Sequence, residues 1–130
     1  MKVRAQRWAP HLLSALRIVS ALLLIEHGTQ KLFGFPGPPA NFPAVLSLLW
    51  WQAIIEIVGG LLLLAGLFTR LVAFVLAGDM AVAYWMVHAP KSFYPVLNGG
   101  DTAVLFCFVF LYIAAAGGGP WSLDRRFLSS

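Results

Sequence analysis

The chain has 130 residues, of which 60% are hydrophobic and only 11% are charged, well above the roughly 45–50% apolar usage of soluble domains. This composition excludes an ordinary soluble domain and predicts a single membrane-embedded unit, residues 1–130. The net charge of +4 does not indicate nucleic-acid binding, because the basic residues flank apolar segments and form no basic stripe on a polar domain.

Four segments are apolar enough to cross the hydrocarbon core of a membrane as helices, which takes about 17–25 residues. In chain order they are residues 12–33, 46–68, 71–89 and 101–117, followed by a polar tail, residues 118–130. The opening MKVRAQR resembles a signal peptide, but Arg17 interrupts the apolar run and no A-x-A site follows it. We therefore predict an uncleaved first helix and an all-α bundle of four transmembrane helices.

The connections between these helices differ in character. Residues 33–45 contain four prolines, which disfavour a helix and predict a stiff loop on the membrane surface. A tight helical hairpin should join the second and third helices, with Gly66 ending one and Thr69 capping the next. Asp101 stands where its carboxylate could cap the fourth helix.

The basic residues near the helix ends predict the orientation of the bundle. The two termini and the short turn between the second and third helices carry more basic residues than the two longer loops do. The longer loops contribute Lys31 and Lys91. By the positive-inside rule, both termini are expected to be cytoplasmic. The residues on the predicted cytoplasmic side are Lys2, Arg4, Arg7, Arg70, Arg125 and Arg126.

Ionisable residues lie inside three of the predicted helices. The first helix contains the stretch LLLIEHGTQKLFGF, and its rise of about 1.5 Å per residue places Glu26 and His27 in the outer half of the membrane. Glu56 and Asp79 fall near the middle of the second and third helices. A charge at such a depth costs about 2.5–3.5 kcal/mol on insertion scales, so each carboxylate is expected to be paired or protonated.

Helical spacing of about 100° per residue divides the polar groups of the first helix into two stripes. Arg17, His27 and Lys31 share one stripe, and Glu26 and Gln30 share another. For Glu56 or Asp79 taken singly, two explanations are equally good: an interhelical bond that only fixes the packing, and a functional role. The cluster of Glu26, His27, Gln30 and Lys31 favours a functional site, because a packing clamp needs one pair and not four polar groups.

No metal site or built-in cofactor is predicted. Cys107 is the single cysteine, which excludes an internal disulfide, and a bis-histidine haem or metal site at His27 and His88 has no supporting C-x-x-C-H or H-x-x-x-H spacing. Tyr84, His88 and Asp101 are retained as secondary candidates for ligand binding or proton handling.

Four motifs in order resemble the DoxX family: RIVSALLLIEHGTQKLFGF, EIVGGLLLLAGLFTR, NGGD and GGGPWSLDRR. The resemblance implies a multi-pass, four-helix protein of the bacterial cytoplasmic membrane, often found beside oxidoreductases and in some relatives tied to quinone-linked oxidation. Asp101 departs from the glutamate expected in NGGE. The matching positions are Arg17, Gly28, Lys31, Glu56, Gly59, Gly60, Arg70, Asn98, Gly99, Gly100, Pro120, Trp121, Ser122 and Asp124.

Three functions follow as hypotheses. The first is a membrane subunit or accessory protein of a redox system, not catalytic alone, whose cavity binds a quinone-like head group and whose electrons come from a partner oxidoreductase. Its cavity is expected to be lined by Glu26, His27, Gln30, Lys31 and Glu56.

The second hypothesis is transport of a proton or small solute past Arg17, Asp79, Glu56 and Glu26, with a homo-oligomer enclosing the path. The third is an assembly module without chemistry of its own. In that case the tail would dock an oxidoreductase through Trp121, Ser122, Asp124 and Arg125, with Ser122 capping a short helix.

Overall fold

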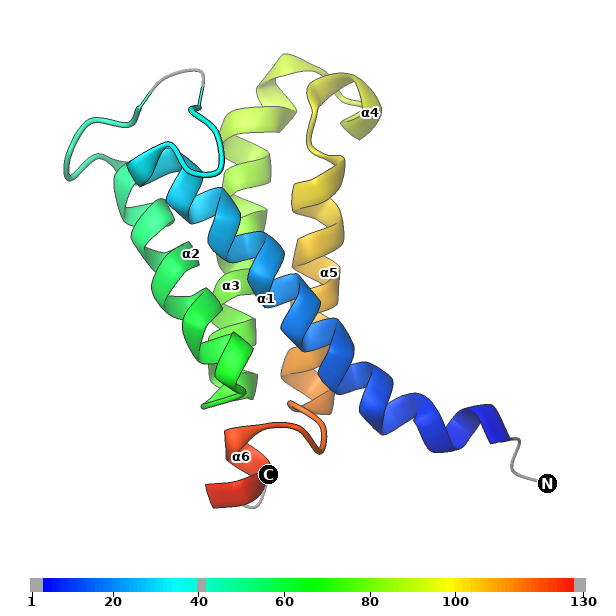
Figure 1. The fold of residues 1–130 in the computed structure, drawn as a ribbon. Helices are drawn as coiled ribbons and strands as arrows, with labels where there is room; N and C mark the ends of the chain where they lie inside the picture. The colour runs from blue at the N-terminus through cyan, green and yellow to red at the C-terminus, as the bar shows by residue number, and fades with distance from the viewer. Residues whose placement is uncertain (1–3, 40–41, 128–130) are drawn as a thin grey trace.

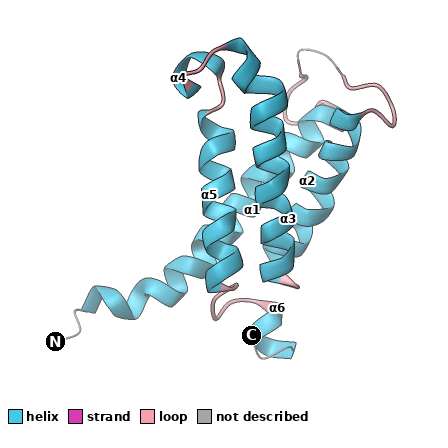
Figure 2. Cartoon of the chain, turned by 180° about the vertical axis from the view of Figure 1, so that it is seen from behind, coloured by secondary structure: helices cyan, strands magenta, loops and turns pink. Residues whose placement is uncertain are grey.

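The computed structural model describes residues 4–39 and 42–127, and within these ranges the chain is helical without a β-strand (Figures 1 and 2). The all-helical prediction is therefore confirmed for the described residues. Three stretches are long and apolar enough to cross a membrane, Arg4–Phe33, Leu48–Ala65 and Thr69–Lys91, and Asp101–Ala116 is a shorter apolar helix. Lys2, used above for orientation, lies outside the described residues.

The helices agree with the four predicted segments and add short elements at their ends. The order is η1 (Arg4–Trp8), α1 (Ala9–Phe33), α2 (Leu48–Ala65), α3 (Thr69–Ala83), η2 (Tyr84–His88), η3 (Ala89–Lys91), α4 (Pro95–Asn98), α5 (Asp101–Ala116) and α6 (Leu123–Phe127). The third predicted helix changes at Tyr84 into a single π-helical turn, a feature that frequently occurs at functional sites.

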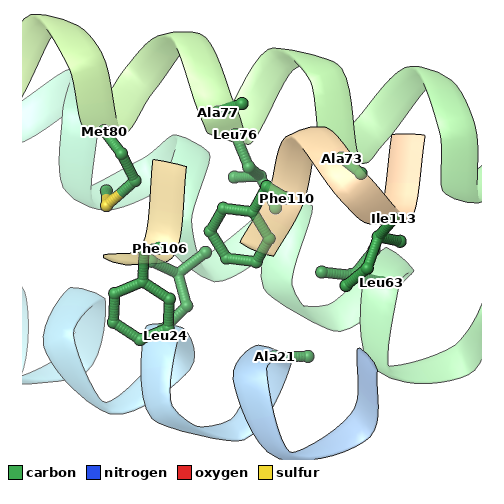
Figure 3. Packing of buried hydrophobic residues seen from close by; sticks show 10 residues of the cluster. All are labelled: Ala21, Leu24, Leu63, Ala73, Leu76, Ala77, Met80, Phe106, Phe110 and Ile113. Carbon is green, nitrogen blue, oxygen red and sulfur yellow. The ribbon is translucent and has the colours of Figure 1, made fainter. Parts of the chain in front are cut away.

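The helices pack as two pairs, α1 with α2 and α3 with α5, which α2 and α3 join (Figure 1). Figure 3 shows the core between them, where the rings of Phe106 and Phe110 stack with their centroids 5.4 Å apart. Gly28 lets α1 approach α2 closely, since a Cβ there would lie 2.7 Å from Ile57 Cγ1. This close approach brings the polar residues of α1 against those of α2.

Two predicted helix caps are wrong, and one is confirmed. Thr69 and Asp101 are the first residues of their helices, whose N-caps are Phe68 and Gly100, and neither cap makes a side-chain hydrogen bond. The Asp101 carboxylate still lies in the first turn, where a negative charge is favoured by the helix dipole. Ser122 does cap α6, because its Oγ accepts a hydrogen bond from the Arg125 amide at 3.2 Å.

The C-terminal segment folds back onto the ends of α1, α2 and α3. Arg17, only 1% exposed, donates hydrogen bonds to the carbonyl oxygens of Gly118 and Trp121, the latter at 2.7 Å. Ser14 Oγ donates to the same Gly118 oxygen at 3.0 Å and accepts from the Trp121 amide at 3.1 Å. These residues, together with Asp124, form what we call the C-terminal clasp.

Asp124 supplies the helix cap that Thr69 was expected to provide. Its two carboxylate oxygens accept hydrogen bonds from the amides of Phe68 and Thr69, each at 2.7 Å. Burial alone would raise the pKa of Asp124, but these amide hydrogens and the charge of Arg17 hold that pKa below its usual range. The folded state therefore favours the charged carboxylate and ties the C-terminal segment to the start of α3.

Replacing Asp124 by asparagine should lower the stability of the folded protein by about 1.5–3 kcal/mol at neutral pH, because the side-chain amide keeps one acceptor oxygen and loses a hydrogen bond to a charged group. A carboxylate with a depressed folded pKa contributes stability above its unfolded pKa of about 3.9 and loses it as the pH falls through the folded pKa. Thermal unfolding in detergent from pH 7 to pH 3 should show a constant difference above about pH 5 that shrinks below about pH 4. A difference independent of pH across this range would contradict the assignment.

Candidate functional site

An ion pair joins α1 and α2 inside the bundle. Lys31 Nζ lies 3.1 Å from Glu56 Oε1 and 3.2 Å from Glu56 Oε2, so the ammonium faces both carboxylate oxygens. The Glu56 side chain is only 2% exposed, whereas that of Lys31 is 28% exposed. The lysine near the C-terminal end of α1 thus reaches inward to neutralise a carboxylate that α2 buries.

Asp79 adds a second carboxyl group to this ion pair. Its charge interacts with both Glu56 and Lys31, and its Oδ2 is buried without a hydrogen-bond partner in the described part of the chain. Gln52 reaches the same turn of α3 and donates a long hydrogen bond, 3.5 Å, to the Asp79 backbone oxygen. The ammonium of Lys31 bonds to the Glu56 carboxylate, and Asp79 Oδ2 is left without a bond from a described residue.

A cavity of about 240 Å³ opens beside the ion pair, and we call it the central cavity. It lies between α1, α2, α3 and α5, and His88 of η2 and Gly99, which follows α4, complete its wall. One part of the lining is polar and the other apolar, the mixture typical of sites that orient a small amphipathic ligand. The polar lining residues are His27, Lys31, Glu56, His88 and Thr102, and the apolar ones include Leu24, Met80 and Phe106.

The two histidines of the central cavity have defined tautomers. Nδ1 of His27 lies 2.8 Å from the Leu23 carbonyl oxygen, and Nδ1 of His88 lies 3.1 Å from that of Asn98. A carbonyl oxygen can only accept, so Nδ1 carries the hydrogen in both rings. In the neutral form of each ring, Nε2 is then the nitrogen left to accept a hydrogen bond from a ligand.

Asn98 positions His88 through a network at the end of α4. Its side-chain amide donates to Tyr84 Oη at 3.1 Å and to the Ser92 carbonyl at 2.9 Å, while its Oδ1 accepts from the Gly100 amide at 2.8 Å. Asn98 is 2% exposed, so these bonds are shielded from solvent. The NGGD motif thereby holds Gly99 and His88, which both line the central cavity.

Several predicted residues lie outside this cavity. Glu26 is exposed, Gln30 is half-buried, and neither lines the cavity, in agreement with their separate stripe on α1. Tyr84 lines another cavity, of about 240 Å³, together with Cys107. Asp101 is exposed at the start of α5.

Arg17 lies in the C-terminal clasp and is not among the residues that line the central cavity. Of the tail residues proposed to dock a partner, Ser122 and Asp124 are buried within the chain, whereas Trp121 and Arg125 are exposed. Sequence reasoning missed Thr102 and Phe106 as lining residues, because neither is ionisable. The only feature of the sequence that could have indicated them is their position, one helical turn apart just after the NGGD motif.

Within the ranges that the structure describes, no group of three or more histidine, cysteine, aspartate or glutamate residues is arranged to hold a metal ion. The fold and the site together define a helical membrane protein with a buried ion pair beside a mixed polar and apolar cavity. The family model of DoxX matches residues 12–89 of this chain, and the chain therefore belongs to the DoxX family.

Two relatives match the chain over most of its length. An uncharacterised protein of Haemophilus influenzae is 39% identical over 127 residues, covering 94% of this chain and 95% of the relative. An uncharacterised membrane protein of Mycobacterium tuberculosis is 28% identical over 128 residues, covering 85% of this chain and 78% of the relative. No solved structure matches the chain significantly.

Proposed function

We propose that this DoxX protein is a membrane-embedded subunit of a redox system, and that its central cavity binds the head group of a quinone-like molecule. The observation that carries the proposal is the combination, in one cavity of about 240 Å³, of an ammonium group, two imidazoles and an apolar wall that includes an aromatic ring. A quinone head group needs both kinds of surface, since its ring is apolar and its two oxygens are polar.

The hydrogen-bonding groups of the cavity suit both redox forms of such a ligand. Lys31 offers a donor to a carbonyl oxygen, as the oxidised form presents. The free Nε2 atoms of His27 and His88 offer acceptors to hydroxyl groups, as the reduced form presents. Phe106 supplies an aromatic face, and its ring packs edge-on against His27 with the centroids 6.0 Å apart.

The carboxyl groups beside the cavity supply a place to hold a proton. A quinone takes up protons together with electrons when it is reduced, so a site for it requires groups that exchange protons. Glu56 lines the cavity and is paired with Lys31, and Asp79 precedes the lining residue Met80 in α3. In this proposal Glu56 passes a proton toward the cavity, Asp79 retains one, and a partner oxidoreductase supplies the electrons.

The proposal includes α5 as a fourth membrane-crossing helix. Its 16 residues span roughly 24 Å, slightly less than a hydrocarbon core of about 30 Å. Its packing along α3 supports this arrangement. With both termini in the cytoplasm of a bacterium, the central cavity would lie toward the outer leaflet of the cytoplasmic membrane.

The test is quinone binding to the purified full-length protein in mild detergent. We expect a short-chain ubiquinone analogue to bind. His88→Ala should weaken binding by about tenfold, the equivalent of one hydrogen bond of about 1.4 kcal/mol. Glu56→Gln should weaken it by a similar factor, because Lys31 loses the carboxylate that holds its ammonium in place. Glu26→Gln is the matched control, because it makes the same change on the exposed face of α1. Native mass spectrometry and equilibrium titration supply the readout.

Equal binding by wild type and Glu56→Gln, or no binding by any form, would contradict the proposal. Proton flux into proteoliposomes that depends on Glu56 and Asp79, without quinone binding, would favour the transport hypothesis instead.

A further inference from the structure

A second polar hollow lies at the other end of the bundle from the NGGD loop. It is about 340 Å³ in volume and is lined by Arg4, Arg7, Trp8 and His11, and we call it the arginine pocket. In Figure 1 the N-terminal end of α1 extends away from the other helices, at the end of the bundle where α6 lies, and Figure 2 shows the same from behind. The redox proposal makes no use of these residues.

The local backbone places the two arginines on one side of the chain. In a 3₁₀-helix, residues three apart are eclipsed, and η1 spans Arg4–Trp8, so the side chains of Arg4 and Arg7 leave it in the same direction. His11 follows one turn later in α1, and its ring lies between those of Trp8 and Trp121, with centroid separations of 6.2 and 5.3 Å. The result is a pocket with two guanidinium groups and an imidazole.

The two arginines of the pocket have no counterion within the described residues. Neither Arg4 nor Arg7 forms an ion pair there, and the first acidic residue of the sequence is Glu26. Nδ1 of His11 is buried and has no hydrogen-bond partner in the described ranges. Guanidinium groups bind phosphate through paired hydrogen bonds, so an anionic phosphate ester matches the pocket in both charge and hydrogen bonding.

The surroundings of the pocket select a lipid over a soluble phosphate. The segment continues directly into α1, and the whole stretch Arg4–Phe33 is apolar enough to cross a membrane. Trp8 and Leu12, each 62% exposed, add apolar surface beside the arginines. Indole rings favour the boundary between head groups and acyl chains, and basic residues next to a membrane helix attract anionic lipids.

We propose that the arginine pocket binds the phosphate of an anionic phospholipid, such as phosphatidylglycerol, whose acyl chains lie along the exposed face of α1. The lipid would hold the N-terminal end of α1 at the membrane surface.

The test uses the purified full-length protein in mixed micelles that contain phosphatidylglycerol and phosphatidylcholine, with retained lipids identified by native mass spectrometry. Wild type should retain phosphatidylglycerol selectively. Arg4→Gln/Arg7→Gln should weaken that retention by on the order of tenfold or more, because one basic residue near an anionic surface contributes about a factor of five. Arg125→Gln/Arg126→Gln removes the same charge from α6 without touching the pocket and should retain the lipid.

Three results would overturn the proposal. Equal loss in both double variants would mean that general surface charge attracts the lipid. Unchanged retention in Arg4→Gln/Arg7→Gln would exclude the pocket. Displacement of the lipid by millimolar inorganic phosphate would identify a soluble phosphate as the occupant.

Discussion

Replacing Lys31 by methionine is expected to destabilise the folded protein by about 3–5 kcal/mol, the usual loss when one partner of a buried ion pair is removed. Methionine keeps the length of the side chain and removes its charge, so Glu56 remains 2% exposed without the ammonium that faces both its oxygens. Asp79 loses the same cation. Thermal and denaturant unfolding in detergent, followed by circular dichroism, measures the loss.

A second substitution distinguishes the charge from the packing. The double variant Lys31→Met/Glu56→Gln replaces the buried carboxylate by a neutral amide, so most of the lost stability should return. Lys91→Met is the matched control, because Lys91 is exposed and forms no ion pair with a described residue. If Lys31→Met were as stable as Lys91→Met, the ion pair would not hold α1 against α2.

Replacing Arg17 by methionine is expected to have the other large effect, a loss on the order of 3 kcal/mol. Its guanidinium donates to carbonyl oxygens of Gly118, Trp121 and, at 3.5 Å, Leu64. Hydrogen bonds to charged groups contribute about 1.5–3 kcal/mol each. The Trp121 carbonyl would lose its bond from Arg17, whereas the Gly118 carbonyl would keep the one from Ser14 Oγ. Unfolding measurements should show the loss of stability.

Limited proteolysis locates the effect of the Arg17 substitution. Cleavage between α5 and α6 should become faster in Arg17→Met, because the C-terminal segment is held through the clasp. Arg126→Met serves as the control, since Arg126 is exposed and its guanidinium lies over the ring of Phe127, with its Cζ 5.6 Å from the centroid. A destabilised variant with unchanged cleavage in this segment would argue against the clasp.

Much of the fold was predictable from the sequence because the membrane imposes a simple rule. Apolar runs long enough to cross it must form helices, since backbone groups cannot remain unpaired in hydrocarbon. The predicted segments therefore agree with α1, α2, the stretch from α3 to η3, and α5 to within a few residues. The end of α2 was also predictable, because Gly66 adopts a φ of 74° that other residues disfavour.

The site was predictable only in part. The buried acids and the stripe of α1 that carries His27 and Lys31 followed from hydropathy and helical spacing. Which acid Lys31 meets depends on how α1 and α2 are aligned, and that alignment is set by the close contact at Gly28. Glu26 is one residue from His27, yet it faces away from the cavity because successive residues on a helix point in different directions.

The sequence by itself determined that this is a helical membrane protein with charges inside its helices, since both facts depend on composition and local spacing. Tertiary structure alone decided the partners of those charges. Asp124 caps a helix that begins 55 residues earlier in the chain, and Arg17 binds carbonyls 101 and 104 residues away. Such contacts depend on the three-dimensional arrangement of whole helices, which no local pattern of residues encodes.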